Sequence, residues 1–437
     1  MARRLMLALL LSCWSPLAWA DAASDCNQDK DNDLRVSGCT RFLKTNPDNA
    51  GAYANRSLAY LDKSDLDRAI ADSAKAIGLD PKSAAAYQSR AFAYLGKGDY
   101  DRAIADAAKL IEIDPKRASA YQSRAFAYAK KGGHDQAIAD STKAIELDPK
   151  LASAYDSRSI AYFNKGDFDR AIADAGRAIE LTPHRAAAYH WRGAVAAKKG
   201  HYDQAIADAS KAIELDPKYA AAYDNRSLAY FNKGDFDHCI ADAGKALEFD
   251  PKLAAAYNRR SAAHTRKGAY DQAIADATKA LEINPRLAAA YNNRSLAFFD
   301  MGDLERSIAD ASKALVLDPK LAVAYNTRSL AYARMGEDAR AVADATKALD
   351  LNPRLAGAYN SRGFAYAKLG DYDQSIADAS RAIELDPKLA AAYRTRGFAY
   401  GKNGEANSAI ADFRRELALE PDSQSAKEAL KRLGASP

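Results

Sequence analysis

Two charged residues recur at one fixed spacing along most of the chain. Eleven arginines follow one another at a constant period of thirty-four positions from Arg56 to Arg396, and each is followed sixteen positions later by an aspartate, from Asp72 to Asp412. Such a ladder could be an anion-binding or charge-relay track, or each arginine could pair with its own aspartate inside the protein. Pairing is the favoured interpretation, because it would hold near-identical units in register, and the loss of one buried partner costs about 3–5 kcal/mol.

No other set of residues has the spacing of a catalytic or metal site. The six histidines never lie four positions apart. Beyond Ala20, the chain has no glycine-rich phosphate loop, no nucleophilic serine motif and no cysteine pair with zinc spacing. We therefore predict that the protein is not an enzyme, with no catalytic residue, no metal ligand and no cofactor.

Proline and glycine mark the elements that position the charged pairs. Twelve prolines share the period of the arginines, from Pro47 to Pro421, and each unit between them has two stretches of helical periodicity, as in residues 223–230. A glycine separates the two stretches in ten of eleven units, with Ser64 as the exception. Glycine there would end the first helix in the left-handed conformation. Each unit is thus predicted to be a helix hairpin with its arginine and aspartate level, eight positions before and after the glycine.

This pattern resembles the tetratricopeptide repeat family, in which aromatic, small, tyrosine, alanine and proline positions recur with the same period. The first aromatic position is tyrosine in all eleven units, from Tyr53 to Tyr393. The resemblance implies an all-α fold, a right-handed α-α superhelix of helix hairpins. Two departures stand out. The family usually has leucine where this chain has its repeated arginine, and a large aromatic residue in the second helix where this chain has alanine or serine until Phe413.

The first residues are typical of a secretory signal peptide, predicted as residues 1–20. Two arginines precede an apolar stretch, residues 5–11, and Ala18-Trp19-Ala20 offers a cleavage site. The leader, and a resemblance to exported bacterial repeat proteins with paired cysteines in the first unit, favour the bacterial periplasm, with secretion or a lipid anchor as alternatives. The anchor would be an acyl chain on Cys13, since Leu10-Leu11-Ser12-Cys13 loosely resembles a lipoprotein box. No transmembrane segment is expected after cleavage, because no later stretch is long and apolar enough.

The two ends of the array should differ from its interior, because a terminal hairpin lacks one neighbour. We predict a degenerate capping repeat at residues 21–49, eleven repeats at 50–423 and a capping helix at 424–437. Cys26 and Cys39 fall at inward positions of the first hairpin, and export permits a disulfide between them, contributing roughly 3 kcal/mol. Cys239 replaces a repeated alanine and should be a small buried residue.

The charge balance argues against nucleic acid as a partner. Without Arg3 and Arg4 of the leader, the formal net charge falls from +5 to +3, and the chain has no concentrated basic run.

Relatives in the family bind an extended peptide or a partner helix in a concave groove lined by the first helices. In this chain the groove would carry two rows of side chains. The polar row is His190, Asp224, Asn258, Asn292, Asn326 and Asn360. The apolar row is Leu58, Phe92, Phe126, Ile160, Leu228, Leu296, Leu330, Phe364 and Phe398. We predict a non-enzymatic scaffold that binds an unidentified protein or extended peptide in this groove. An envelope-associated assembly or export-machinery lipoprotein is the alternative.

Residues 186–287 depart most from the repeated pattern. Small residues stand there beside aromatic and basic ones, and together they could form a pocket. Neutral sequence variation, in a repeat array that accepts substitutions, is the simpler interpretation. The candidate partner-binding residues are His190, Trp191, Lys198, Asp224, Leu228, Phe231, Asn258 and Arg266.

Overall fold

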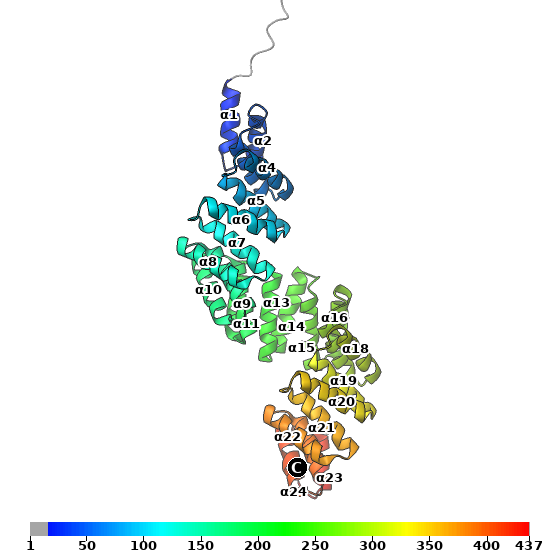
Figure 1. The fold of residues 1–437 in the computed structure, drawn as a ribbon. Helices are drawn as coiled ribbons and strands as arrows, with labels where there is room; N and C mark the ends of the chain where they lie inside the picture. Colours follow the sequence, from blue (N-terminus) through cyan, green and yellow to red (C-terminus); the bar gives the residue numbers. More distant parts are fainter. Residues whose placement is uncertain (1–15, 437) are drawn as a thin grey trace, which may run out of the picture. The chain divides into compact units, whose positions relative to one another are not determined.

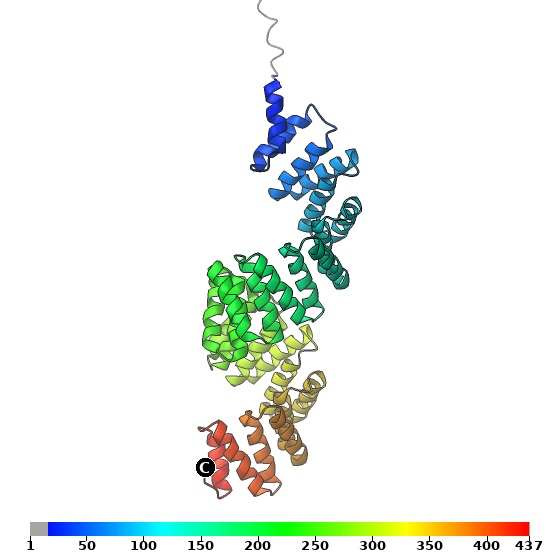
Figure 2. The same ribbon diagram turned by 90° about the vertical axis from the view of Figure 1, so that its left-hand side faces the viewer.

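The computed structural model describes residues 16–436, so most of the predicted signal peptide, with Cys13, lies outside the described part of the chain. The described residues form 25 α-helices and no strand. They fall into two compact units, divided between Asp216 and Pro217. Within each unit, successive helices lie side by side as stacked hairpins (Figure 1 and Figure 2). The predicted all-α fold is confirmed.

The helices of the first unit follow one another in chain order. They are α1 (Pro16–Asn27), α2 (Asn32–Leu43), α3 (Ala50–Asp62), α4 (Leu66–Leu79), α5 (Ala84–Lys97), α6 (Tyr100–Ile113), α7 (Ala118–Lys131), α8 (His134–Leu147), α9 (Ala152–Asn164), α10 (Phe168–Leu181), α11 (Ala186–Lys199) and α12 (Tyr202–Leu215). Because α1 begins at Pro16, cleavage after Ala20 would leave residues 21–27 of this helix.

The second unit repeats the arrangement and adds one unpaired helix at its end. Its helices are α13 (Ala220–Lys233), α14 (Phe236–Phe249), α15 (Ala254–Arg266), α16 (Tyr270–Ile283), α17 (Ala288–Asp300), α18 (Leu304–Leu317), α19 (Ala322–Met335), α20 (Asp338–Leu351), α21 (Ala356–Leu369), α22 (Tyr372–Leu385), α23 (Ala390–Lys402), α24 (Ala406–Leu419) and α25 (Gln424–Arg432).

Each full hairpin turns at a residue with a left-handed backbone. Ten of these residues are glycines, from Gly98 to Gly404, with φ between +74° and +90°. Ser64 makes the same turn with φ +59°, a conformation that costs a residue with a side chain roughly 1–2 kcal/mol. The second helix ends just before the residue that precedes the repeated proline, as α14 does at Phe249, ahead of Asp250 and Pro251. The predicted glycine and proline signals are confirmed.

Alanine fills most of the buried interior. In the hairpin of α13 and α14, Ala222, Ala229, Ala243 and Ala246 are fully buried. Cys239 is also fully buried, as predicted for a small core residue, and burial raises the pKa of its thiol. Since each hairpin buries little apolar area by itself, its stability depends on stacking against its neighbours.

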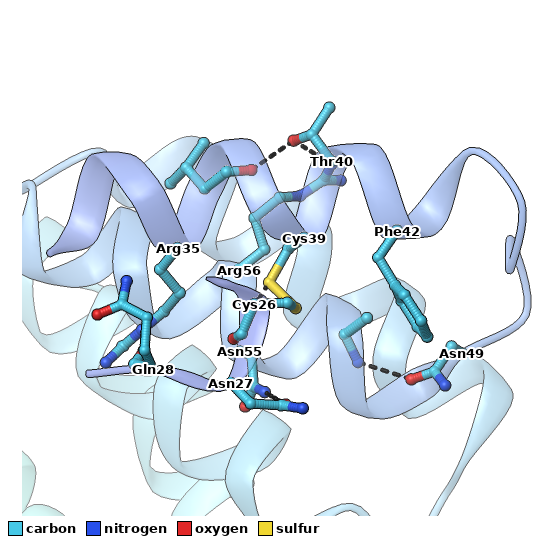
Figure 3. The surroundings of a disulfide bond; sticks show 12 residues. Cys26, Asn27, Gln28, Arg35, Cys39, Thr40, Phe42, Asn49, Asn55 and Arg56 are labelled. Carbon is cyan, nitrogen blue, oxygen red and sulfur yellow. Dashed lines mark hydrogen bonds between the residues drawn. A yellow bond between two sulfur atoms is a disulfide. The ribbon is translucent and has the colours of Figure 1, made fainter. Parts of the chain in front are cut away.

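A disulfide joins α1 to α2. The sulfur atoms of Cys26 and Cys39 lie 2.06 Å apart, and both residues are buried (Figure 3). The guanidinium of Arg56, on α3, donates from Nη1 to Thr40 Oγ1 on α2 at 3.0 Å. The predicted cysteine pair is therefore present, and a hydrogen bond ties the bridged hairpin to the next one.

A short helix covers the last hairpin. α25 packs Ala426 and Leu430 against Phe413 of α24. Beside them the fully buried Glu416 stands where all earlier full units except one, which has Leu110, have alanine, and its Oε1 accepts hydrogen bonds from Arg394 at 2.8 Å and Ser423 at 2.6 Å. This buried carboxylate was not predicted from the sequence, because a departure from the pattern in a terminal unit cannot be told from neutral sequence variation.

Candidate interaction surface

The repeated arginine and aspartate pair within each of the eleven full hairpins. Arg56 donates from Nε to Asp72 Oδ2 at 2.6 Å and from Nη2 to Asp72 Oδ1 at 2.8 Å. The same pairing recurs in all eleven units, ending with Arg396 and Asp412. The aspartate hydrogen bond raises the pKa of each arginine, which stays charged. The predicted level pairing is confirmed.

A tyrosine ring covers the other side of each guanidinium. The carbon Cζ of each repeated arginine lies 5.5–5.9 Å from the centre of the tyrosine ring three positions earlier. This distance permits a cation–π interaction. In several units the remaining nitrogen also donates to the preceding hairpin, as Arg328 Nη1 does to Ser312 Oγ at 3.0 Å. The arginine ladder is thus engaged inside the array, which argues against an anion track.

The polar row of the predicted groove joins neighbouring first helices in the second unit. The oxygen of each side chain accepts a hydrogen bond from a residue 35 positions later. The donor and acceptor pairs are Arg259 to Asp224, Asn293 to Asn258, Thr327 to Asn292, Ser361 to Asn326 and Thr395 to Asn360. These bonds were not predicted from the sequence, although a residue able to donate follows each polar-row position in the next unit.

The predicted patch at residues 186–287 is divided between the two units. In the first unit, Trp191 donates from Nε1 to Ser159 Oγ at 2.8 Å and packs edge-on against Phe163, with ring centres 5.3 Å apart. Its neighbour His190 is half-buried on α11, and Lys198 is exposed at the end of the same helix. The tryptophan thus has a structural role inside its own unit.

The remaining patch residues lie on α13 and α15 of the second unit. Phe231 packs against Phe236, with ring centres 5.6 Å apart, and Leu228 is half-buried. Asp224 and Asn258 are held in the inter-helix hydrogen bonds described above, whereas Arg266 is exposed. The binding role of these residues stays a prediction.

Exposed aromatic rings occur further along the second unit. Phe364 on α21 and Phe398 on α23 belong to the predicted apolar row and keep 38% and 45% of their surface exposed. A lysine one helical turn later covers each ring: Lys368 Nζ lies 5.6 Å from the centre of Phe364, and Lys402 Nζ lies 5.7 Å from that of Phe398. We call these four residues the Phe–Lys strip.

Between residues 16 and 436, no group of three or more His, Cys, Asp or Glu side chains could hold a metal ion. A shallow hollow of about 400 Å³ in the first unit is lined by Lys97, Asp99, Tyr100, Asp101 and Lys131, and both of its lysines are in ion pairs. No helix in the same part of the chain is long and apolar enough to cross a membrane.

Stacked hairpins that expose a strip of side chains define a helical repeat scaffold. Family models described as tetratricopeptide repeat match most of the chain. The matched residues are 50–83, 84–117, 118–151, 158–220, 220–253, 263–322, 322–355 and 356–389. The chain belongs to the tetratricopeptide repeat family. No curated protein sequence matches it.

Solved structures support the fold. A chain of the APC/C hetero-tetramer Cut9–Hcn1 is similar with a TM-score of 0.58 and 17% identity, over 95% of each chain. A tetratricopeptide repeat protein from Parabacteroides merdae has a TM-score of 0.47 and 20% identity, over 57% of this chain and 98% of its own. Yeast Tom70 has a TM-score of 0.41 and 19% identity, over 93% and 99%. At these identities, the first likeness supports the fold alone.

Proposed function

We propose that the protein is a non-enzymatic scaffold that binds a protein or an extended peptide along the first helices of its hairpins. The observation that supports this proposal is the Phe–Lys strip, whose two rings lie on successive first helices, α21 and α23. A partner that covers the exposed part of each ring gains hydrophobic free energy at about 25 cal/mol per Å² of apolar surface. The second unit is therefore the preferred binding region.

The lysines of the strip define what the partner should carry. Lys368 Nζ donates to Ala333 O at 2.9 Å, which holds it beside Phe364, and Lys402 Nζ lies beside Phe398. These cations are held beside the rings at little further entropic cost, so carboxylates of a bound segment can pair with them. An apolar peptide with acidic residues fits this surface better than a nucleic acid, because aromatic burial and only a few cations are offered.

The Cys26–Cys39 disulfide favours an oxidising compartment. We infer export, with the bacterial periplasm as the preferred location. A lipid-anchored protein of envelope assembly or export machinery remains the second candidate, and it differs in one measurable property. Intact mass of the mature protein distinguishes an N-terminus at Asp21 from an acylated Cys13, and an N-terminus at Met1 in exported material would contradict both.

Site-directed photo-crosslinking tests the binding proposal. A photoreactive phenylalanine analogue at Phe398 should form an adduct with one partner protein in the exported fraction. The same analogue at Val316, which is 73% exposed on the second helix α18, is the matched control and should form none. Once a partner is crosslinked, the double variant Phe364→Ala and Phe398→Ala should weaken its binding about tenfold or more. Equal adducts at both positions, or none at Phe398, would contradict the proposal.

A further inference from the structure

One row of side chains at the turn edge of the hairpins forms ion pairs between neighbouring units. A lysine at the end of a first helix pairs with an aspartate thirty positions earlier, near the start of the preceding second helix. We call these pairs the lysine ladder. They are Lys63–Asp33, Lys97–Asp67, Lys131–Asp101, Lys165–Asp135, Lys199–Asp169 and Lys267–Asp237.

The ladder stops within the second unit, and an apolar row continues in its place. Met301, Met335 and Leu369 stand at the ladder's lysine position in three successive hairpins, with 49%, 44% and 55% of their surface exposed. We call these three residues the apolar edge. Asp271 and Glu305 stand where the ladder would supply a carboxylate to Met301 and Met335, and neither has an ion-pair partner within residues 217–436.

The apolar edge is unusual because its members are in register. Single exposed apolar residues are common on protein surfaces and need no explanation. Here three of them follow one another at the same position of neighbouring hairpins, where six upstream hairpins place an ion-paired lysine. Exposed apolar residues that recur in register over three neighbouring hairpins are therefore a candidate interaction site.

The spacing and charge of the edge define its occupant. Neighbouring packed helices lie about 8–10 Å apart, so the three side chains should span about 20 Å. Seven residues of an α-helix advance about 10.5 Å, so one apolar residue every two turns of a partner helix matches the edge. Lysine or arginine beside those residues would supply the cations that Asp271 and Glu305 lack, and the flexible methionines can adapt to the partner's shape.

We propose that the apolar edge binds a basic amphipathic α-helix of a partner protein. This site lies at the turn ends of α17, α19 and α21, so it is a second interaction surface beyond the proposed groove function. The helix would place its apolar residues on Met301, Met335 and Leu369 and its basic residues against the two bare carboxylates.

A synthetic peptide tests the proposal. The probe is a fluorescent helical peptide of about 21 residues, with leucine at every seventh position and lysine beside each leucine. Fluorescence anisotropy with the full chain should show saturable, salt-sensitive binding. The triple variant Met301→Asn, Met335→Asn and Leu369→Asn should bind the peptide about tenfold more weakly or worse. Asparagine is a neutral choice that the fold accepts, because Asn403 holds the same position in the last full hairpin.

Three controls establish whether the peptide binds at the apolar edge. A peptide with glutamate in place of lysine should not bind, and the groove variant Phe364→Ala with Phe398→Ala should bind the basic peptide as the wild type does. Transplanting the edge provides the converse test. In the first unit, Lys131→Met, Lys165→Met and Lys199→Met leave the carboxylates of Asp101, Asp135 and Asp169 bare, so the stoichiometry of bound peptide should rise.

Equal binding by the wild type and the asparagine variant would overturn the proposal, as would a wild type that does not bind the peptide. Self-association in analytical ultracentrifugation that the asparagine variant abolishes would assign the edge to a second copy of this chain, which also overturns the basic-helix occupant. Circular dichroism and thermal unfolding confirm that each variant is folded.

Discussion

Arg226 and Asp242 face each other across one hairpin through two parallel hydrogen bonds, Nε to Oδ2 at 2.7 Å and Nη2 to Oδ1 at 2.8 Å. The aspartate is buried and the arginine side chain is 21% exposed. Solvent is mostly excluded from the carboxylate. The pair therefore fixes the two helices of the hairpin in register, which an exposed ion pair of the array does not do.

Removing one member of this pair should destabilise the second unit. Asp242→Ala leaves a guanidinium without its carboxylate, so the free energy of unfolding should fall by about 3 kcal/mol. The double variant Arg226→Leu with Asp242→Leu should recover most of that loss, since leucine is apolar and leaves no buried charge. Urea unfolding measures both changes.

The exposed pair of Lys245 and Glu248 provides the control, because Lys245→Ala should change the unfolding free energy by less than about 0.5 kcal/mol. If Asp242→Ala is as mild as this control, the buried pair does not hold the hairpin together.

Ser64 is the one hairpin turn of the eleven that lacks glycine, and it keeps φ at +59°. Ser64→Gly should raise the stability of the first unit by about 1 kcal/mol, because glycine adopts this conformation without strain. The reverse change at an equivalent turn, Gly132→Ser, has open space around the new side chain and should cost a similar amount. Denaturant midpoints measure both changes, and shifts of the same sign would refute the assignment of strain to the turn.

The disulfide should stabilise its own hairpin more than the rest of the array. Cys26→Ser with Cys39→Ser should increase hydrogen exchange in α1 and α2, because the bridge closes a short loop worth roughly 3 kcal/mol. Exchange in α13–α25 should stay as in the wild type, since distant hairpins couple only through their neighbours. If hydrogen exchange increases equally in both units, the disulfide stabilises the whole chain and not its own hairpin alone.

Acid should weaken the second unit partly through His264. Its Nε2 lies 3.7 Å from Asp276 Oδ2, yet burial lowers the pKa of His264 below its ordinary value of 6.5. Nearby Arg260 and Lys267 lower this pKa further, whereas Asp276 opposes the shift. A histidine with a lowered folded-state pKa binds its proton more readily in the unfolded chain, so the free energy of unfolding falls as the pH drops below about 6.5.

His264→Phe tests this effect, since Phe298 occupies the same position one unit later. The loss of stability between about pH 7.5 and about pH 5.5 should be smaller in the variant than in the wild type. His184→Asn, at an exposed loop position, should leave the pH dependence unchanged. If the two variants behave alike, other groups cause the acid sensitivity.

Features that repeat within one unit were predictable from the sequence. The level Arg–Asp pairs, the turn glycines and the burial of Cys239 all follow from spacing inside a single hairpin. The bond from Thr327 to Asn292 was not predictable in the same way, because its partners lie 35 residues apart and meet only through the stacking of two hairpins. The exposed fraction of a side chain was not predictable either, since Phe364 is exposed and Phe126 is half-buried although they hold the same repeat position and a lysine lies over each ring.

The buried Glu416 limits how the molecule can polymerise. Interior hairpins present alanine at this position, or leucine at Leu110, where the next hairpin packs, so any free end built like them would accept a further hairpin from another chain. At the last hairpin, Glu416 replaces that alanine, and α25 occupies the surface through Ser423. A second molecule could add here only by displacing α25 and removing Ser423 and Ser425 as partners of the buried Glu416 carboxylate, which would keep only Arg394. Head-to-tail fibre growth, a hazard of self-similar arrays, is therefore opposed wherever α25 covers the hairpin of α23 and α24.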